Sequence, residues 1–147
     1  MREFSQSGNM RIELELLDVD ANDPDSLRVR LSISISHSSG EYRYSADDIW
    51  FSMDVLMRFQ SDLSKGLLSP ANLFDQSEYI SIYLSLTNNG KSKILNVKIS
   101  AYEPVLGYGE IALKSDFSLD YDTLFVEELR RSVSESINNL QLSKCGK

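Results

Sequence analysis

Apolar and polar residues alternate along three segments in the first third of the chain. Isoleucine and leucine alternate with glutamate over 12–16, and apolar residues alternate with arginine and serine over 27–36. A period of two is typical of a strand with one apolar and one wet face. A third, less regular strand is predicted over 41–51. The intervening segments 18–25 and 37–40 are rich in Asp, Asn, Ser, Pro or Gly, and are predicted to be a loop and a hairpin turn.

The period then changes to that of a helix. Ser52 is a suitable N-cap, Asp54 places a carboxylate in the first turn, and Gly66 is a suitable C-terminal stop. The segment 67–77 contains Pro70 and is predicted to be a connecting loop. The residues expected to face inward are Met53, Leu56, Met57, Gln60 and Leu63.

The same order of patterns follows in the second half. Strand alternation is present over 80–86 and 95–101, with an Asn-Asn-Gly turn at 88–90 between them. The segment 104–109 is expected to break the ladder, and 111–119 continues it.

A second helix is predicted after either Asp120 or Asp122 as N-cap. Its outward face is expected to carry the charged residues of the segment. The expected inward residues are Leu124, Phe125, Leu129, Val133, Ile137 and Leu140, and the expected outward residues are Glu127, Glu128, Arg130, Arg131 and Glu135.

The order is therefore βββα-βββα, which favours the α+β class. Because the wet strand faces are rich in serine and charge, we expect one antiparallel sheet of about six strands with both helices packed on one face. A length of 147 residues suits a single domain over 1–147, with loose tails at 1–9 and 141–147.

Composition narrows the function classes. Hydrophobic residues make up 41% and charged residues 25%, as in globular proteins. The net charge of −7 argues against a nucleic-acid partner, because phosphates are bound by Lys and Arg. The N-terminus lacks the apolar core of a signal peptide, and no apolar run reaches the ~18–20 residues of a membrane span. The expected location is the cytoplasm, with no membrane partner.

Catalytic signatures are sparse. The one histidine, His37, is expected in a turn, and the one cysteine, Cys145, in the C-terminal tail, so neither a triad nor an ordinary zinc site can be assembled. The glycines at 107–109 do not form a phosphate-binding loop. An EF-hand loop starting at Asp18 fails, because its positions 6 and 12 hold residues other than the required Gly and Glu. We therefore expect no enzyme activity, no cofactor and no metal.

Carboxylates and tyrosines are the candidate binding residues. The acidic positions are either a solvated loop or a docking surface for a basic partner. The tyrosines are either ordinary strand residues or interface hot spots. The candidate partner-binding residues are Asp18, Asp20, Asp23, Asp25, Asp47, Asp48, Tyr79 and Tyr83.

The two helix-entry segments, 51–63 and 117–129, each follow a set of alternating strands. With the periodicity over 12–140, this organisation resembles the WapI-type immunity proteins of bacterial polymorphic-toxin systems, which are used in contact-dependent inhibition. The resemblance implies a protein that neutralises a cognate toxin in the producing cell, and it carries over no partner-binding residue.

A cytoplasmic, acidic domain without catalytic equipment agrees with that implication. The expected function is binding and stoichiometric occlusion of a basic toxin domain, such as a nuclease, which must hold phosphates. A non-catalytic adaptor that binds an endogenous partner is the alternative, and a carboxylate-based hydrolase is the second alternative. The sequence does not indicate the oligomeric state.

Overall fold

A computed structural model describes residues 9–37, 39–90, 92–105, 109–120 and 123–145. The predicted α+β class and the order of strands and helices are confirmed, with one additional short strand. The elements are β1 (Asn9–Val19), β2 (Ser26–His37), β3 (Gly40–Ser52), α1 (Met53–Ser64), β4 (Ala71–Phe74), β5 (Ile80–Asn89), β6 (Ser92–Val105), β7 (Gly109–Asp120) and α2 (Thr123–Cys145).

The strands form two separate antiparallel sheets, so the expectation of one sheet of about six strands was wrong. The first sheet has the order β1-β2-β3 and the second has the order β4-β5-β6-β7. Alternation in a strand shows that one face is buried, but not whether a helix or a second sheet covers it. Here α1 leads the chain from β3 to the second sheet.

One hydrophobic core joins the two sheets and both helices. The cross-strand pair Ile12 and Ile33 and the pair Ile82 and Ile99 contribute from the first and second sheet respectively. Phe59 of α1 belongs to the same cluster of buried residues. The inner face of each sheet is therefore apolar, while the outer faces keep the serines and charges of the alternation.

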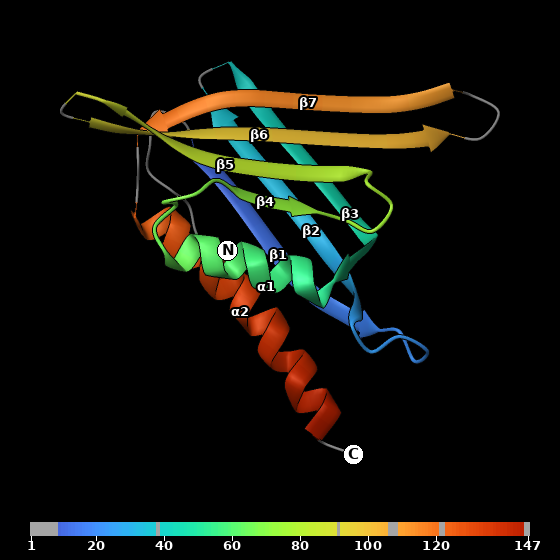
Figure 1. Cartoon of the computed structure of the whole chain (residues 1–147). Coiled ribbons are helices and arrows are strands. Elements are labelled where there is room, and N and C mark those ends of the chain that lie inside the picture. The colour runs from blue at the N-terminus through green and yellow to red at the C-terminus, as the bar shows by residue number, and fades with distance from the viewer. Residues whose placement is uncertain (1–8, 38, 91, 106–108, 121–122, 146–147) are drawn as a thin grey trace.

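The helices lie along sheet edges, which corrects the expectation that both cover one face of a single sheet. α1 packs along β4, and α2 packs along β1 and against α1 (Figure 1). The Ser132 hydroxyl of α2 accepts a hydrogen bond from the Leu14 amide at 3.1 Å and donates one to the Leu14 carbonyl at 3.0 Å. Because an edge strand exposes unpaired backbone groups, this contact closes β1 at that point.

Both predicted ends of α1 are confirmed. The Ser52 hydroxyl accepts a hydrogen bond from the Val55 amide at 3.3 Å. At the other end Gly66 has φ +69°, and the amides of Gly66 and Leu67 bond to the carbonyls of Leu63 and Asp62. This bond pattern is the Schellman motif, in which the left-handed residue suits glycine.

The buried face of α1 differs partly from the predicted one. Phe59 is buried, whereas Met57 is 48% exposed and Gln60 is half-buried. Gln60 donates a hydrogen bond to the Ser134 hydroxyl of α2 at 2.5 Å. With 3.6 residues per turn, Phe59 and Gln60 lie equally far on either side of a buried arc centred on Leu56 and Leu63, whereas Met57 lies beyond it. Gln60 is on the side that meets α2, where its amide finds the Ser134 hydroxyl.

The inward face predicted for α2 is confirmed where side chains are described. Phe125, Leu129, Val133 and Ile137 are buried. Leu124, Leu140 and the cap candidate Asp122 lie outside the residues or side chains that the structure describes, and Asp120 is the last residue of β7. Neither described helix has a stretch long and apolar enough to cross a membrane.

Several boundaries differ from those expected. β4 lies inside the segment 67–77, which was predicted to be a loop. The prediction failed because a strand of four residues directly after Pro70 is too short to show alternation. Pro104 continues β6 and pairs with Glu110, within the segment 104–109 where a break was expected, and residues 106–108 of that segment lie outside the described residues. β5 and β6 form the hairpin predicted around 88–90. Their pairing extends further than expected, because Asn89 still pairs with Ser92.

The ends of the described chain are also more regular than expected. Asn9 begins β1, and α2 continues to Cys145, through most of the segment 141–147 that was expected to be a loose tail.

Candidate protein-binding surface

The acidic loop between β1 and β2 is held by its own carboxylates. Asp20 accepts a hydrogen bond from the Asn22 amide at 2.9 Å, and Asp23 accepts one from the Asp25 amide at 3.2 Å. Backbone bonds from the Ser26 amide to the Asp23 carbonyl, and from the Asp20 amide to the Ser26 carbonyl, close the loop. Bonds of this type are typical of Asx turns, which fix the backbone. The acidic side chains are therefore presented from an ordered loop.

Two further segments meet this loop. The Met53 amide donates to the Asp25 carbonyl at 2.8 Å, which places exposed Asp54 beside it. The Ser26 hydroxyl bonds to the Gln76 side chain at 3.1 Å, so the loop after β4 also adjoins the β1–β2 loop. Exposed Glu78 of that loop has φ +59°, a conformation rare for residues other than glycine.

These contacts define a surface that we call the acidic end. Its members come from the β1–β2 loop, the first turn of α1 and the loop after β4. They are Asp18, Asp20, Asp23, Asp25, Asp54 and Glu78. Asp54 and Glu78 cannot be placed on this surface from the sequence, because only tertiary hydrogen bonds bring their segments beside the loop.

Asp47 and Asp48 flank the acidic end on β3. Both are exposed at an irregularity in the β2–β3 pairing, between Val29 and Leu31. The Arg28 guanidinium donates to the Asp47 carbonyl at 3.2 Å, and Arg28 lies opposite Asp18 in the β1–β2 ladder. One arginine thus separates these aspartates from the acidic end.

The candidate tyrosines lie on the outer face of the second sheet. Tyr79 directly follows Glu78, is 42% exposed, and has its ring 6.2 Å from that of Tyr102 at a tilt of 57°. Tyr83 is half-buried further along β5, opposite Asn72. Tyr79 therefore borders the acidic end and Tyr83 does not, so the sequence-predicted residues do not form one patch. Tyr102 was missed because its position beside Tyr79 depends on the register of β5 and β6.

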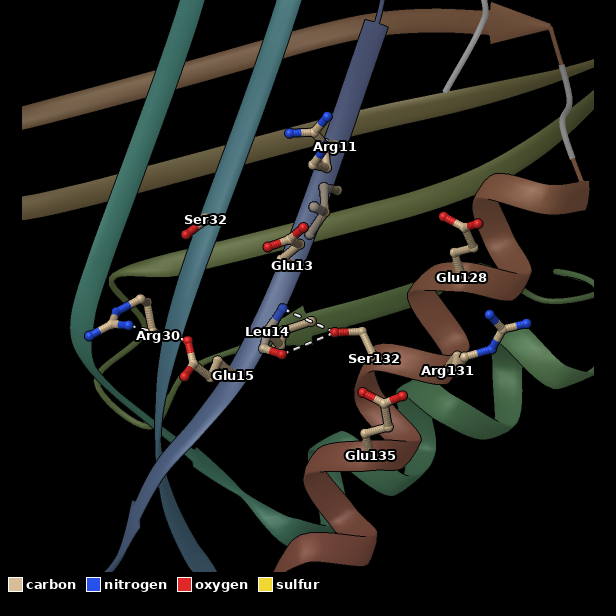
Figure 2. Close-up of a pocket in the computed structure, with 11 residues that line it drawn as sticks. Arg11, Glu13, Leu14, Glu15, Arg30, Ser32, Glu128, Arg131, Ser132 and Glu135 are labelled. Carbon is tan, nitrogen blue, oxygen red and sulfur yellow. Dashed lines mark hydrogen bonds and ion pairs between the residues drawn. The ribbon is translucent and has the colours of Figure 1, made fainter. Parts of the chain in front are cut away.

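A groove of about 370 Å³ runs between β1 and α2 (Figure 2). Charged side chains of both signs line it: Arg11, Glu13, Arg30, Glu128, Arg131 and Glu135. Arg30 pairs with Glu15 at 3.2 Å. Small-molecule sites are mostly lined by apolar side chains, so the charged lining of this groove is not typical of such a site.

The outward carboxylates of α2 are partly neutralised by their neighbours. Arg130 forms an ion pair with Glu127, and its hydrogen bond holds the pKa of the Glu127 carboxyl below the usual value. The cation placed beside the acidic end by the strand pairing is Arg28, opposite Asp18.

The residues considered for catalysis lie far apart in the chain. His37 ends β2, where it pairs with Gly40, and Cys145 ends α2. Within the described ranges, no group of three or more His, Cys, Asp or Glu residues is placed to hold a metal ion.

No family model matches the chain, and no match was found among curated proteins.

Proposed function

We propose that this protein is an immunity protein that binds a cognate toxin domain through the acidic end. The observation that carries the proposal is the ordered presentation of carboxylates from three segments at one end of the fold. Tertiary hydrogen bonds hold those segments together, at the Met53 amide and at Gln76.

A basic toxin is the partner that suits this surface. The chain has a net charge of −7, and the acidic end gathers six carboxylates, with Arg28 opposite Asp18 as a neighbouring cation. Complementary charge steers association and raises its rate. A nuclease domain must hold phosphates, and a carboxylate surface can occupy the same basic site. Inhibition is then stoichiometric occlusion in the cytoplasm of the producing cell.

The tyrosines at the border contribute differently from the aspartates. Tyr79 and Tyr102 are both large, partly exposed and in mutual contact. Aromatic side chains supply hot spots that slow dissociation, whereas rim charges chiefly alter the association rate. The two residue classes should therefore be separable by kinetics.

The proposal predicts that a toxin domain is encoded immediately upstream, at the C-terminus of a large secreted protein, and the test uses that domain. Neutralising Asp18, Asp20, Asp23 and Asp25 to asparagine should slow association at low salt. The difference should shrink toward ~1 M salt, where the Debye length is about 3 Å. Tyr79→Ala should speed dissociation by about tenfold or more, the effect of losing ~1.4 kcal/mol. The kinetics are measured by stopped flow, and Tyr83→Ala tests whether the interface extends further along β5.

A charge-matched control removes the effect of net charge. It carries Asp62→Asn, Asp116→Asn, Glu127→Gln and Glu135→Gln, which neutralise as many carboxylates away from the acidic end. An equal loss of association rate in this control would remove the acidic end from the account. The immunity function is contradicted if the intact protein neither binds that domain nor protects cells expressing it, or if no such gene lies upstream.

A further inference from the structure

β3 is an outermost strand whose long edge is not covered by a helix within the described part of the chain. It spans Gly40–Ser52 and pairs with β2 on one side. Near its C-terminal end the Trp50 carbonyl accepts a hydrogen bond from the Gln76 amide and α1 follows directly, so the part of the edge near Gly40 is the one considered below. The edges of β1 and β4 are instead packed against α2 and α1 (Figure 1). An edge strand presents a row of backbone donors and acceptors that can pair with another strand.

Near its start, β3 carries one negative and one positive side chain, so two antiparallel copies of this segment can match opposite charges. Glu41 and Arg43 are both exposed on the outer face of the sheet, on either side of Tyr42. Within one copy the Arg43 Nε atom donates to Glu41 at 2.7 Å. The planar guanidinium carries two further nitrogen atoms, so one arginine can bond to two carboxylates.

We propose that two copies of this chain associate by antiparallel pairing of their β3 edges, with the twofold axis at Tyr42. Each Glu41 then lies opposite the partner copy's Arg43, and the two sheets of three strands become one sheet of six. Gly40 lies opposite the partner copy's Tyr44, where the absence of a side chain leaves room for the aromatic ring.

Charge selects this register over its neighbours. An axis perpendicular to the sheet keeps outer faces together, so each residue must pair with one of the same face. Moving the axis to Glu41 places the two Glu41 carboxylates opposite each other, and moving it to Arg43 does the same for the two guanidinium groups. Like charges directly opposite in a sheet are destabilising, whereas opposite charges stabilise. Only the axis at Tyr42 pairs both residues favourably among these three.

The test exchanges the charges one at a time. Glu41→Arg gives arginine against arginine across the axis, and Arg43→Glu gives glutamate against glutamate. Each variant alone should dimerise about tenfold more weakly than the parent, measured by sedimentation over a range of protein concentrations. The double variant Glu41→Arg/Arg43→Glu should recover dimerisation. Mixing the two single variants should also restore it, as a heterodimer in which both cross-strand pairs are complementary.

Glu15→Arg is the matched control, because it makes the same change of charge on the outer face of β1 at the opposite edge of the sheet. It should dimerise as the parent does. A parent that stays monomeric at all concentrations would overturn the inference, and so would single variants that do not complement each other. Circular dichroism on each variant separates these outcomes from unfolding. Because toxin binding is measured separately, failure here leaves the proposed function standing.

Discussion

At the residue scale, Ser132 gives the edge of β1 the hydrogen bonds that a neighbouring strand would otherwise supply. Its hydroxyl serves both the amide and the carbonyl of Leu14. Ser132→Ala leaves two part-buried backbone groups without that partner, and such losses cost about 1–3 kcal/mol per buried group. We expect the free energy of unfolding in urea to fall by about 2 kcal/mol. Ser81→Ala, which removes a long exposed contact to Asn72, should change it little. Equal losses in the two variants would contradict the role of Ser132.

Removing the hydroxyl of Tyr42 should have the opposite effect on stability from removing that of Ser132. Its hydroxyl is buried and has no hydrogen-bond partner among the described residues, and burial raises the pKa of the phenol above 10.0. The neutral form is therefore favoured in the folded protein, and stability contributed by this group is lost as the pH rises above about 10.

Tyr42→Phe should keep or raise the free energy of unfolding at neutral pH, by up to about 1 kcal/mol, since no bond is lost. It should also reduce the loss of stability at alkaline pH. Urea unfolding at neutral and alkaline pH, in dilute protein, measures both effects. Tyr83→Phe serves as a control on the outer face, and a large loss in Tyr42→Phe at neutral pH would show that the hydroxyl has a partner.

At the scale of elements, the end of α1 depends on two consecutive residues with positive φ, Gly66 and Leu67. Gly66 has φ +69°, and its amide and that of Leu67 complete the helix end. Gly66→Ala should lower the free energy of unfolding by about 1 kcal/mol, because a side chain disfavours this left-handed region. Gly40→Ala is the control, measured in dilute protein so that pairing of two copies does not contribute, since no positive φ occurs at Gly40 and a Cβ meets nothing within 4 Å. Thermal unfolding of both variants decides the comparison, and a Gly40→Ala loss as large as that of Gly66→Ala would contradict it.

Elements with strong local signals could be predicted from the sequence. Ser52 and Gly66 predict the ends of α1 correctly, because helix capping depends on residues within one turn of the helix end. β4 has no comparable signal, since it is four residues long and is a strand only through its pairing with β5. The face of α1 was placed too far toward Met57, because periodicity alone does not fix the centre of the buried arc.

At the scale of the whole molecule, the arrangement of the sheets could not be predicted. Alternation over β2 and β5 shows one apolar face each, but the same pattern suits helix cover or sheet cover. The candidate site could likewise be predicted only in part from the sequence. The acidic loop is visible as a run of aspartates, whereas Glu78 joins it only through the contact between Ser26 and Gln76.

The closure of β1 by α2 joins an early strand to the last described helix, because Leu14 and Ser132 are 118 residues apart. During synthesis on a ribosome, β1 and β2 emerge long before α2 does. The edge of β1 therefore stays open to other strands throughout most of translation, and such edges promote aggregation of nascent chains. The β1 edge is consequently covered only after α2 has left the exit tunnel, so a chain stalled before that point keeps an open edge strand that promotes aggregation.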